Sequence, residues 1–168
     1  SILKGRMSLE FTYYNKNVYD FLLQNTLPSS SGFTTQWVNA GDLRNRGIEI
    51  GLNAQPILTK HVKWTSSLNF WFNRSMVTRL DITPVQLGSF GFALGTFQIE
   101  QGKSATQILG LTDEAGYNPP IKAWGNQEPR FQMNSFNEIT LNNRLSFRFL
   151  VHWKYKGDNV NLTNLLND

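Results

Sequence analysis

The sequence contains no cysteine, and this absence removes several kinds of structure at once. Without thiols the chain forms no disulfide framework and no thiolate metal site. It also has no apolar run that approaches the roughly 18 residues of a membrane helix, so any membrane role must be carried by strands. Residues 1–6 lack the apolar core and the cleavage site of a signal peptide, and we therefore expect a mature or internal piece of a longer protein.

Signals for nucleic-acid binding and catalysis are equally scarce. The net charge of +4 is spread out without a basic stripe, which argues against nucleic acid as a partner. Residues 102–104 (Gly-Lys-Ser) end like a phosphate-binding loop, but Phe97 stands where that loop needs glycine. No Gly-x-Ser-x-Gly elbow occurs, and neither His61 nor His152 has metal-ligand spacing to a second ligand. We therefore expect no enzyme activity, no metal site and no cofactor.

What the chain does contain is alternation of apolar and polar side chains. Over residues 144–155 the odd-numbered positions from Leu145 to Tyr155 are apolar, while Arg144, Arg148 and Lys154 lie among the even-numbered ones. Successive side chains of a strand point to opposite faces, so one face is apolar and the other is charged. Such a strand is about long enough to cross a tilted bilayer as part of a barrel.

The same pattern recurs along the chain and predicts five long antiparallel strands paired in sequence order. In the fourth strand, which is the weakest, Phe136 and Asn137 break the alternation. The hydrophobic content of 40% and the mean hydropathy of -0.35 do not distinguish a soluble domain from a barrel, because a barrel exposes only alternate residues to lipid. The predicted strands lie near residues 5–14, 43–55, 62–77, 130–141 and 144–156.

The connections between these strands are long, short, long and short, with a tight hairpin at Asn142 and Asn143. Outer-membrane barrels have this rhythm, because their periplasmic turns are short and their extracellular loops are long. The first, third and fifth strands then run outward, with Trp153 and Tyr155 at the outer interface and Trp64 near the inner one. The sequence thus predicts an all-β fold, an antiparallel β-meander that is a section of a large transmembrane β-barrel. About eight strands are needed for closure, so this section needs the rest of its wall.

Several stretches, in this order, resemble SusC/RagA-type TonB-linked outer-membrane transporters. Residues 39–49 (Asn-Ala-Gly-Asp-Leu-Arg-Asn-Arg-Gly-Ile-Glu) and 63–77 are similar to two consecutive strands of that family, and 6–22 to the strand before them. Residues 125–131 and 156–163 are similar to late barrel strands and the loop beyond. The plug, the TonB-contacting box and the final strands of the family have no counterpart here. The resemblance therefore implies that residues 1–168 are a partial TonB-dependent transporter barrel domain.

The resemblance also implies a function and partners. It implies import across the outer membrane of a Gram-negative bacterium of a nutrient too large for porins, such as an oligosaccharide or a peptide. TonB would act through the absent N-terminal part, and a SusD-like lipoprotein would close over the outer loops as a lid. Outer-membrane lipid would surround the barrel. The long segments 25–37, 81–130 and 157–168 would meet the lid or the substrate.

Two groups of residues are candidates for function. Flat rings in the long outward segments either stack on substrate or on the lid, or pack within their own loops; these are Trp37, Phe90, Phe92, Tyr117 and Trp124. Charged residues on the polar faces form the second group: Arg6, Glu10, Glu49 and Arg148. A glycosidase-like carboxylate pair among Glu10, Glu49 and Glu138 is conceivable, but ion-paired charges that face the lumen or the plug are the favoured interpretation.

A soluble, secreted β-sandwich that binds carbohydrate or acts as an adhesin is the alternative. Such a domain also has alternating strands and exposed aromatic residues. The two hypotheses differ in what covers the apolar face. A sandwich buries it under a second sheet, whereas a barrel wall leaves Leu9, Ile50, Phe70, Ile139 and Phe149 on one side with nothing from the chain packed on them.

Overall fold

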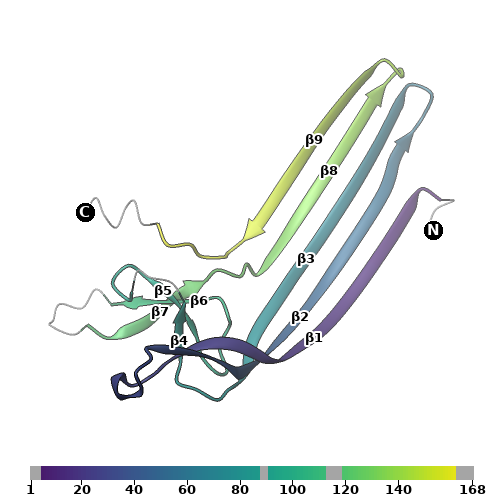
Figure 1. Ribbon diagram of the computed structural model, residues 1–168. Helices are drawn as coiled ribbons and strands as arrows, with labels where there is room; N and C mark the ends of the chain where they lie inside the picture. The colour runs from purple at the N-terminus through teal and green to yellow at the C-terminus, as the bar shows by residue number, and fades with distance from the viewer. Residues whose placement is uncertain (1–4, 88–90, 113–118, 162–168) are drawn as a thin grey trace. The chain divides into compact units, whose positions relative to one another are not determined.

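The computed structural model describes residues 5–87, 91–112 and 119–161, and their regular structure is almost entirely strand (Figure 1). One 3-10 turn, η1 (Ser29–Ser31), is the exception within these residues. No helix in the described part of the chain is both long and apolar enough to cross a membrane. The strands are β1 (Met7–Thr26), β2 (Thr35–Leu58), β3 (Val62–Leu80), β4 (Val85–Leu87), β5 (Thr96–Ile99), β6 (Gln107–Leu111), β7 (Ile121–Asn126), β8 (Phe131–Leu141) and β9 (Leu145–Tyr155).

The strands form two sheets, one in the order β1-β2-β3-β8-β9 and one in the order β4-β5-β6-β7. The first order confirms the predicted antiparallel meander, in which the five long strands pair in sequence order. The contacts divide the chain into two units, and strands β1 to β3 contribute residues to both of them. The first unit comprises residues 1–14, 47–73 and 129–156, and the second comprises 15–46, 74–128 and 157–168.

In the first unit the strand register puts the predicted apolar residues on one face. Trp64 pairs with Ile139, and Ile139 pairs with Phe147, while Phe70 pairs with Met133. Residues that pair directly across antiparallel strands share a face. On β9 this face is open, since Phe149 is 48% exposed and Trp153 is 52% exposed. Within the described residues, then, no second sheet buries β9, which favours a barrel wall over a sandwich.

Aromatic rings gather at one end of this apolar face. The ring of Phe131 on β8 lies 5.5 Å from that of Trp153 and 5.2 Å from that of Tyr155, measured between centroids. Phe70 on β3 approaches the same ring at 5.4 Å. Tryptophan and tyrosine rings suit the level of the lipid headgroups, so the cluster has the composition of an aromatic belt.

The break in alternation at Phe136 and Asn137 is a feature of the folded sheet. Asn137 lies on the apolar face yet is only 6% exposed, and its amide is bonded on both sides. Its Oδ1 accepts a hydrogen bond of 3.1 Å from Trp64 Nε1, and its Nδ2 donates one of 2.9 Å to Ser135 Oγ. Burying an amide is costly unless it is hydrogen-bonded, so these partners allow the residue to stay. Phe136 consequently lies on the polar face, opposite Leu150.

The hairpin between β8 and β9 has the geometry that its sequence predicts. Asn142 and Asn143 both adopt left-handed conformations, with φ of 48° and 54°. Two successive residues of this kind form the two-residue turn that matches strand twist, and asparagine tolerates it. The neighbouring turn is joined to it, because Asn142 N donates to His61 O at 2.7 Å and His61 Nδ1 lies 2.8 Å from Asn142 Oδ1.

In the second unit the first two strands are longer than the sequence predicts. β1 continues to Thr26 instead of ending near residue 14, and β2 begins at Thr35 instead of near residue 43. Alternation does not reveal these extensions, because residues 15–26 are mixed in polarity and Asp20, within β1, has a left-handed φ of 52°. Residues 81–130, which were predicted to be a long loop, contain β4 to β7.

A small core holds this second unit together. Leu23, Val77 and Ile99 are its buried residues, and Phe21 and Leu43 pack against them. The backbone of the segment after β5 is tied to β3, since Val77 N donates to Lys103 O and Gly102 N donates to Val77 O. The segment that was expected to be a loop therefore forms a sheet, and it contributes Ile99 to the core of the second unit.

An arginine joins the first three strands within the same unit. Arg79 on β3 donates to both carboxylate oxygens of Asp42 on β2, at 2.9 and 3.0 Å, and it also pairs with Asp20 on β1 and with Asp81. The hydrogen bonds from Arg79 lower the pKa of the Asp42 carboxyl. The stability that the Arg79–Asp42 interaction adds to the folded state is therefore present at neutral pH, and it is lost as the pH falls through the lowered pKa of Asp42.

A glycine on β2 makes room for a tyrosine of β1 in the first unit, and this close contact generates a prediction. A Cβ at Gly47 would lie 2.2 Å from the hydroxyl of Tyr14 and 2.5 Å from the backbone oxygen of Phe72. We expect Gly47→Ala to cost about 1 to 3 kcal/mol, as overpacking does. The measurement is the urea midpoint and surface abundance of the full-length protein.

Gly51 provides the matched control, four positions away on the same strand and face. A Cβ there would meet Asn69 Oδ1 at 3.5 Å, which is ordinary contact, so Gly51→Ala should be tolerated. Equal stability of the Gly47→Ala and Gly51→Ala proteins would contradict the packing role assigned to Gly47.

Candidate functional site

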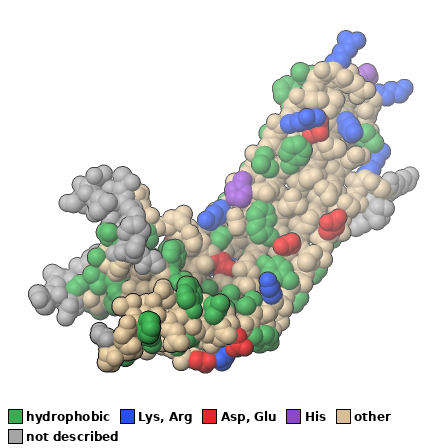
Figure 2. Space-filling model, viewed as in Figure 1, with side chains coloured by type: hydrophobic (Ala, Val, Ile, Leu, Met, Phe, Trp, Pro, Cys, Tyr) green, Lys and Arg blue, Asp and Glu red, His purple; other side chains and the backbone are tan. Residues whose placement is uncertain are grey.

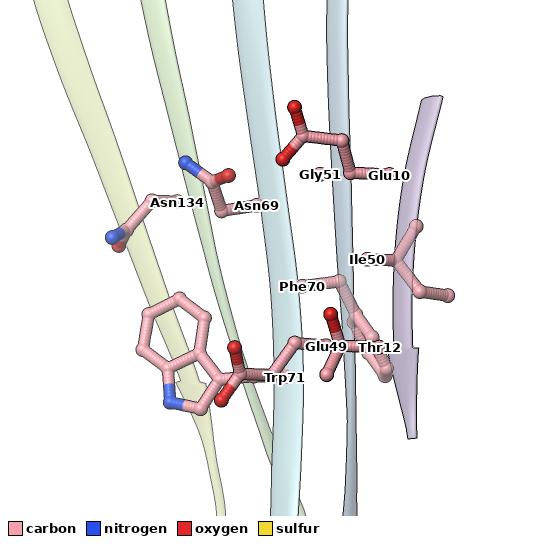
Figure 3. Close-up of a pocket in the computed structure, with 9 residues that line it drawn as sticks. All are labelled: Glu10, Thr12, Glu49, Ile50, Gly51, Asn69, Phe70, Trp71 and Asn134. Atoms are coloured by element: carbon pink, nitrogen blue, oxygen red, sulfur yellow. The ribbon is translucent and has the colours of Figure 1, made fainter. Parts of the chain in front are cut away.

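The polar face of the first unit contains a depression of about 400 Å³, formed by side chains from β1, β2, β3 and β8. Glu10 comes from β1 and Glu49 from β2, while Asn69 and Trp71 come from β3 and Asn134 from β8. Figure 3 shows Glu10 and Glu49 extending in the same direction across the sheet, Glu10 toward Asn69 and Glu49 toward Trp71. Each of these residues lies on the face that its place in the alternation predicts.

Gly51 accounts for the space beneath Glu10. Gly51 has no side chain to fill this space. A Cβ at this position would lie 3.5 Å from Asn69 Oδ1 and 3.7 Å from the Cβ of Glu10. Gly47 and Gly51 on β2 thus have different environments. At Gly47 the space is filled by Tyr14, whereas at Gly51 it remains part of the depression.

Trp71, which lines the depression, has an imidazole beside it that is not itself part of the lining. The ring centroids of Trp71 and His152 are 6.2 Å apart. His152 Nδ1 lies 2.5 Å from Asn134 Oδ1, and since an amide oxygen only accepts, the imidazole is the donor. The amide and the imidazole hold each other in place beside Trp71, so the indole borders a polar surface of fixed geometry.

The charged residues predicted for the polar face differ in their partners. Arg148 pairs with Glu138, its direct cross-strand neighbour, at 2.8 Å between Nη2 and Oε1. Within the described residues Glu10 and Glu49 form neither an ion pair nor a side-chain hydrogen bond, and both are exposed. The side chain of Arg6 likewise makes no ion pair there. The expected pairing is therefore formed at Glu138, whereas Glu10 and Glu49 have no such partner among the described residues.

The aromatic residues predicted to contact substrate or lid also differ in what the structure shows of them. Phe90 and Tyr117 lie outside the described residues. Trp37 on β2 is 65% exposed, and Phe92 is half-buried. Sequence reasoning missed three further exposed residues on or near the ends of β1 and β2, because they belong to no alternating run: Tyr19, Leu22 and Phe33.

Trp124 on β7 packs inside the second unit. Its Nε1 donates to Leu111 O at 3.0 Å, and its ring covers Gly110, where a Cβ would come within 2.0 Å. The same ring lies against Gly95. These contacts favour the loop-packing interpretation for Trp124, whereas the exposed ring of Trp37 is available for a partner.

No group of three or more histidine, cysteine, aspartate or glutamate residues in the described part of the chain is arranged to hold a metal ion. The depression offers carboxylates, amides and one indole. Such a set binds a ligand by charge, hydrogen bonds and stacking.

The contacts of Trp124 generate a prediction. We expect Trp124→Ala to destabilise the β4-β5-β6-β7 sheet by about 2 kcal/mol, less than a fully buried tryptophan would cost, because the ring is 41% exposed. Hydrogen exchange of the full-length protein should show faster exchange in β6 and β7. Trp37→Ala is the control and should leave the amides of β6 and β7 protected. If these amides are equally protected in both variants, Trp124 does not have the structural role assigned to it.

Comparison with known proteins gives one consistent result. The family model described as "TonB dependent receptor-like, beta-barrel" matches residues 2–165. The chain is 32% identical over 110 residues to TonB-dependent receptor P39 of Formosa agariphila, a match that covers 66% of this chain and 10% of that protein. It is 29% identical over 119 residues to TonB-dependent receptor SusC of Bacteroides thetaiotaomicron, covering 59% of this chain and 12% of SusC.

Solved structures show the same fold. The RagAB peptide transporter superposes with a TM-score of 0.64 at 19% identity, covering 89% of this chain and 19% of that chain. The RagAB peptide importer in the open-open state gives 0.67 at 18% identity, with 90% and 19% covered. This chain therefore spans about a tenth of the curated relatives and about a fifth of the solved chains.

Proposed function

Because this chain belongs to the TonB-dependent receptor-like β-barrel family, we propose that it forms part of the wall of an outer-membrane importer. The family is one of receptors and transporters, and its match covers nearly the whole chain. The importer takes up a nutrient too large for porins, such as an oligosaccharide or a peptide. TonB, acting through a part of the protein outside this chain, drives the import, and a SusD-like lipoprotein closes the outer end.

One observation supports the membrane wall most directly, and it is the exposure of the apolar face. Every residue of β9 is exposed, including the apolar side chains at its odd-numbered positions. In water a strip of this kind drives aggregation, whereas in a bilayer it contacts lipid tails. The proposed residence is the outer membrane of a Gram-negative bacterium, with the first unit spanning the bilayer.

The division of the chain into two units supports the proposed docking region. The first unit has the strand length and aromatic end cluster of a bilayer-crossing wall. The second has its own core and sheet, and it exposes Trp37, Tyr19 and Phe33. Exposed aromatic side chains of this size are frequent anchors of protein interfaces. We assign this group, together with Leu22, to contact with the lipoprotein or the substrate.

The two faces of β9 provide a matched test of the membrane wall. Phe149→Arg places a charge on the apolar face near the middle of the strand, where we expect a cost of about 2 to 4 kcal/mol. Leu150→Arg places the same charge on the polar face one residue away and should cost much less. Folded abundance in the outer membrane and the urea midpoint of the full-length protein measure both. If the two variants behave alike, the apolar face does not contact lipid.

The import function is tested in cells that express the full-length protein. Uptake of the cognate nutrient should require TonB, and Trp37→Ala should weaken capture of the lipoprotein roughly tenfold, or reduce uptake, at unchanged surface abundance. Trp124→Phe is the control, since it keeps a packed ring without offering a new surface. Uptake that persists without TonB would refute the proposed function, and full capture and uptake by Trp37→Ala would refute only the assigned contact region.

A further inference from the structure

The depression on the polar face of the first unit has features that the role of a wall does not require. A wall needs polar side chains toward water, but it needs neither an open space beside Gly51 nor an indole bordering it. Figure 3 shows that the side chains of Glu10, Glu49, Asn69 and Trp71 surround one space. An aromatic ring combined with a few convergent polar groups is the usual composition of a ligand site.

The described residues that line this space include two carboxylates and no cationic side chain. Glu10 and Glu49 have no cationic partner in the described residues, although Glu138 on the same face is paired with Arg148. Figure 2 shows that lysine and arginine side chains gather near the end of the sheet that carries the turns, and that acidic and basic side chains both occur farther along. Two carboxylates that share a small space repel each other, and a cation between them removes that repulsion.

The neighbours of the carboxylates narrow the choice of cation. The face of an indole attracts a guanidinium or an ammonium group, and a planar guanidinium also fits carboxylate oxygens in a bidentate manner. Asn69 and Asn134 add amide groups at the same edge. A neutral sugar would also stack on Trp71, but it would leave both charges uncompensated.

We propose that this depression binds the guanidinium or ammonium side chain of a peptide during import. The proposal rests on the import function above and assigns a substrate class to it, namely peptides with a basic side chain. Both carboxylates are exposed, so each ion pair is weak. Weak and reversible binding suits a site along a path, because a substrate held tightly there would not move on.

The experiment compares two peptides in cells that express the full-length transporter with its lipoprotein. The peptides are equal in sequence except that one carries arginine where the other carries citrulline, which has nearly the same shape without the charge. We expect the double substitution Glu10→Gln and Glu49→Gln to raise the KM for uptake of the arginine peptide roughly five- to tenfold, and to leave the citrulline peptide nearly unchanged. Maximal velocity and surface abundance should stay as they are.

Two further variants separate the site from the rest of the face. Glu138→Gln removes a carboxylate from the same face outside the depression and should not distinguish the two peptides. Trp71→Phe should keep part of the preference for arginine, because it keeps an aromatic face, whereas Trp71→Leu should lose more of it.

Each result decides the proposal. A KM change confined to the arginine peptide supports it. An equal rise in KM for both peptides shows that the carboxylates interact with another segment of the transporter itself, which overturns the proposal. An unchanged KM for both peptides shows that the carboxylates bind neither the peptide nor such a segment, which also overturns it. Uptake of another nutrient but of neither peptide also overturns it, while the proposed import function stands. TonB-dependent uptake of no nutrient at all, at normal surface abundance, removes the import function as well.

Discussion

Backbone hydrogen bonding between neighbouring strands is the constraint on which the rest of this structure depends. Once β8 is bonded to β3 on one side and to β9 on the other, the two-residue period fixes the face of every side chain on all three strands. The apolar face and the polar depression are therefore two results of one register. The same constraint leaves β1 and β9 with an unpaired edge each among the described strands. In lipid such edges would cost several kcal/mol per unpaired group, so the proposed membrane wall requires a neighbouring strand at each edge.

Alternation in the sequence was enough to predict the strand order and the faces of the first unit, because there apolar and polar side chains alternate with the two-residue period of a strand. The hairpin at Asn142 and Asn143 was equally predictable, since it depends on the local chemistry of two residues. The second unit was not predictable in this way. Its core residues Leu23, Val77 and Ile99 come from distant parts of the chain, and no periodic signal links them. Polar hydrogen bonds hold Asn137 on the apolar face, and a rule based on hydrophobicity does not register them.

At the candidate site, the local sequence pattern predicts the face on which each charged residue lies, whereas the strand register determines which charges pair. The sequence places Glu10, Glu49 and Arg148 on polar faces, but it does not say which charges meet. Register supplies that answer for Glu138, which lies directly opposite Arg148. Among the tryptophans, Trp37 and Trp124 look alike in sequence, since both fall in segments that the sequence predicts to be long loops. Only the contact of Trp124 with Gly110 and Leu111 separates a packed ring from an exposed one.

Gly47 and Gly51, four residues apart on β2, show how little sequence separates a glycine that serves packing from one that shapes the candidate site. Both are on the polar face, and each removes one side chain from it. At Gly47 the hydroxyl of Tyr14 occupies the vacated space, so this glycine contributes to the packing of β1 on β2. At Gly51 the space stays open below Glu10, so this glycine contributes to a cavity. A sheet whose backbone is fixed by hydrogen bonds can therefore change what its polar face binds through single side chains, while the apolar face and the strand order stay the same.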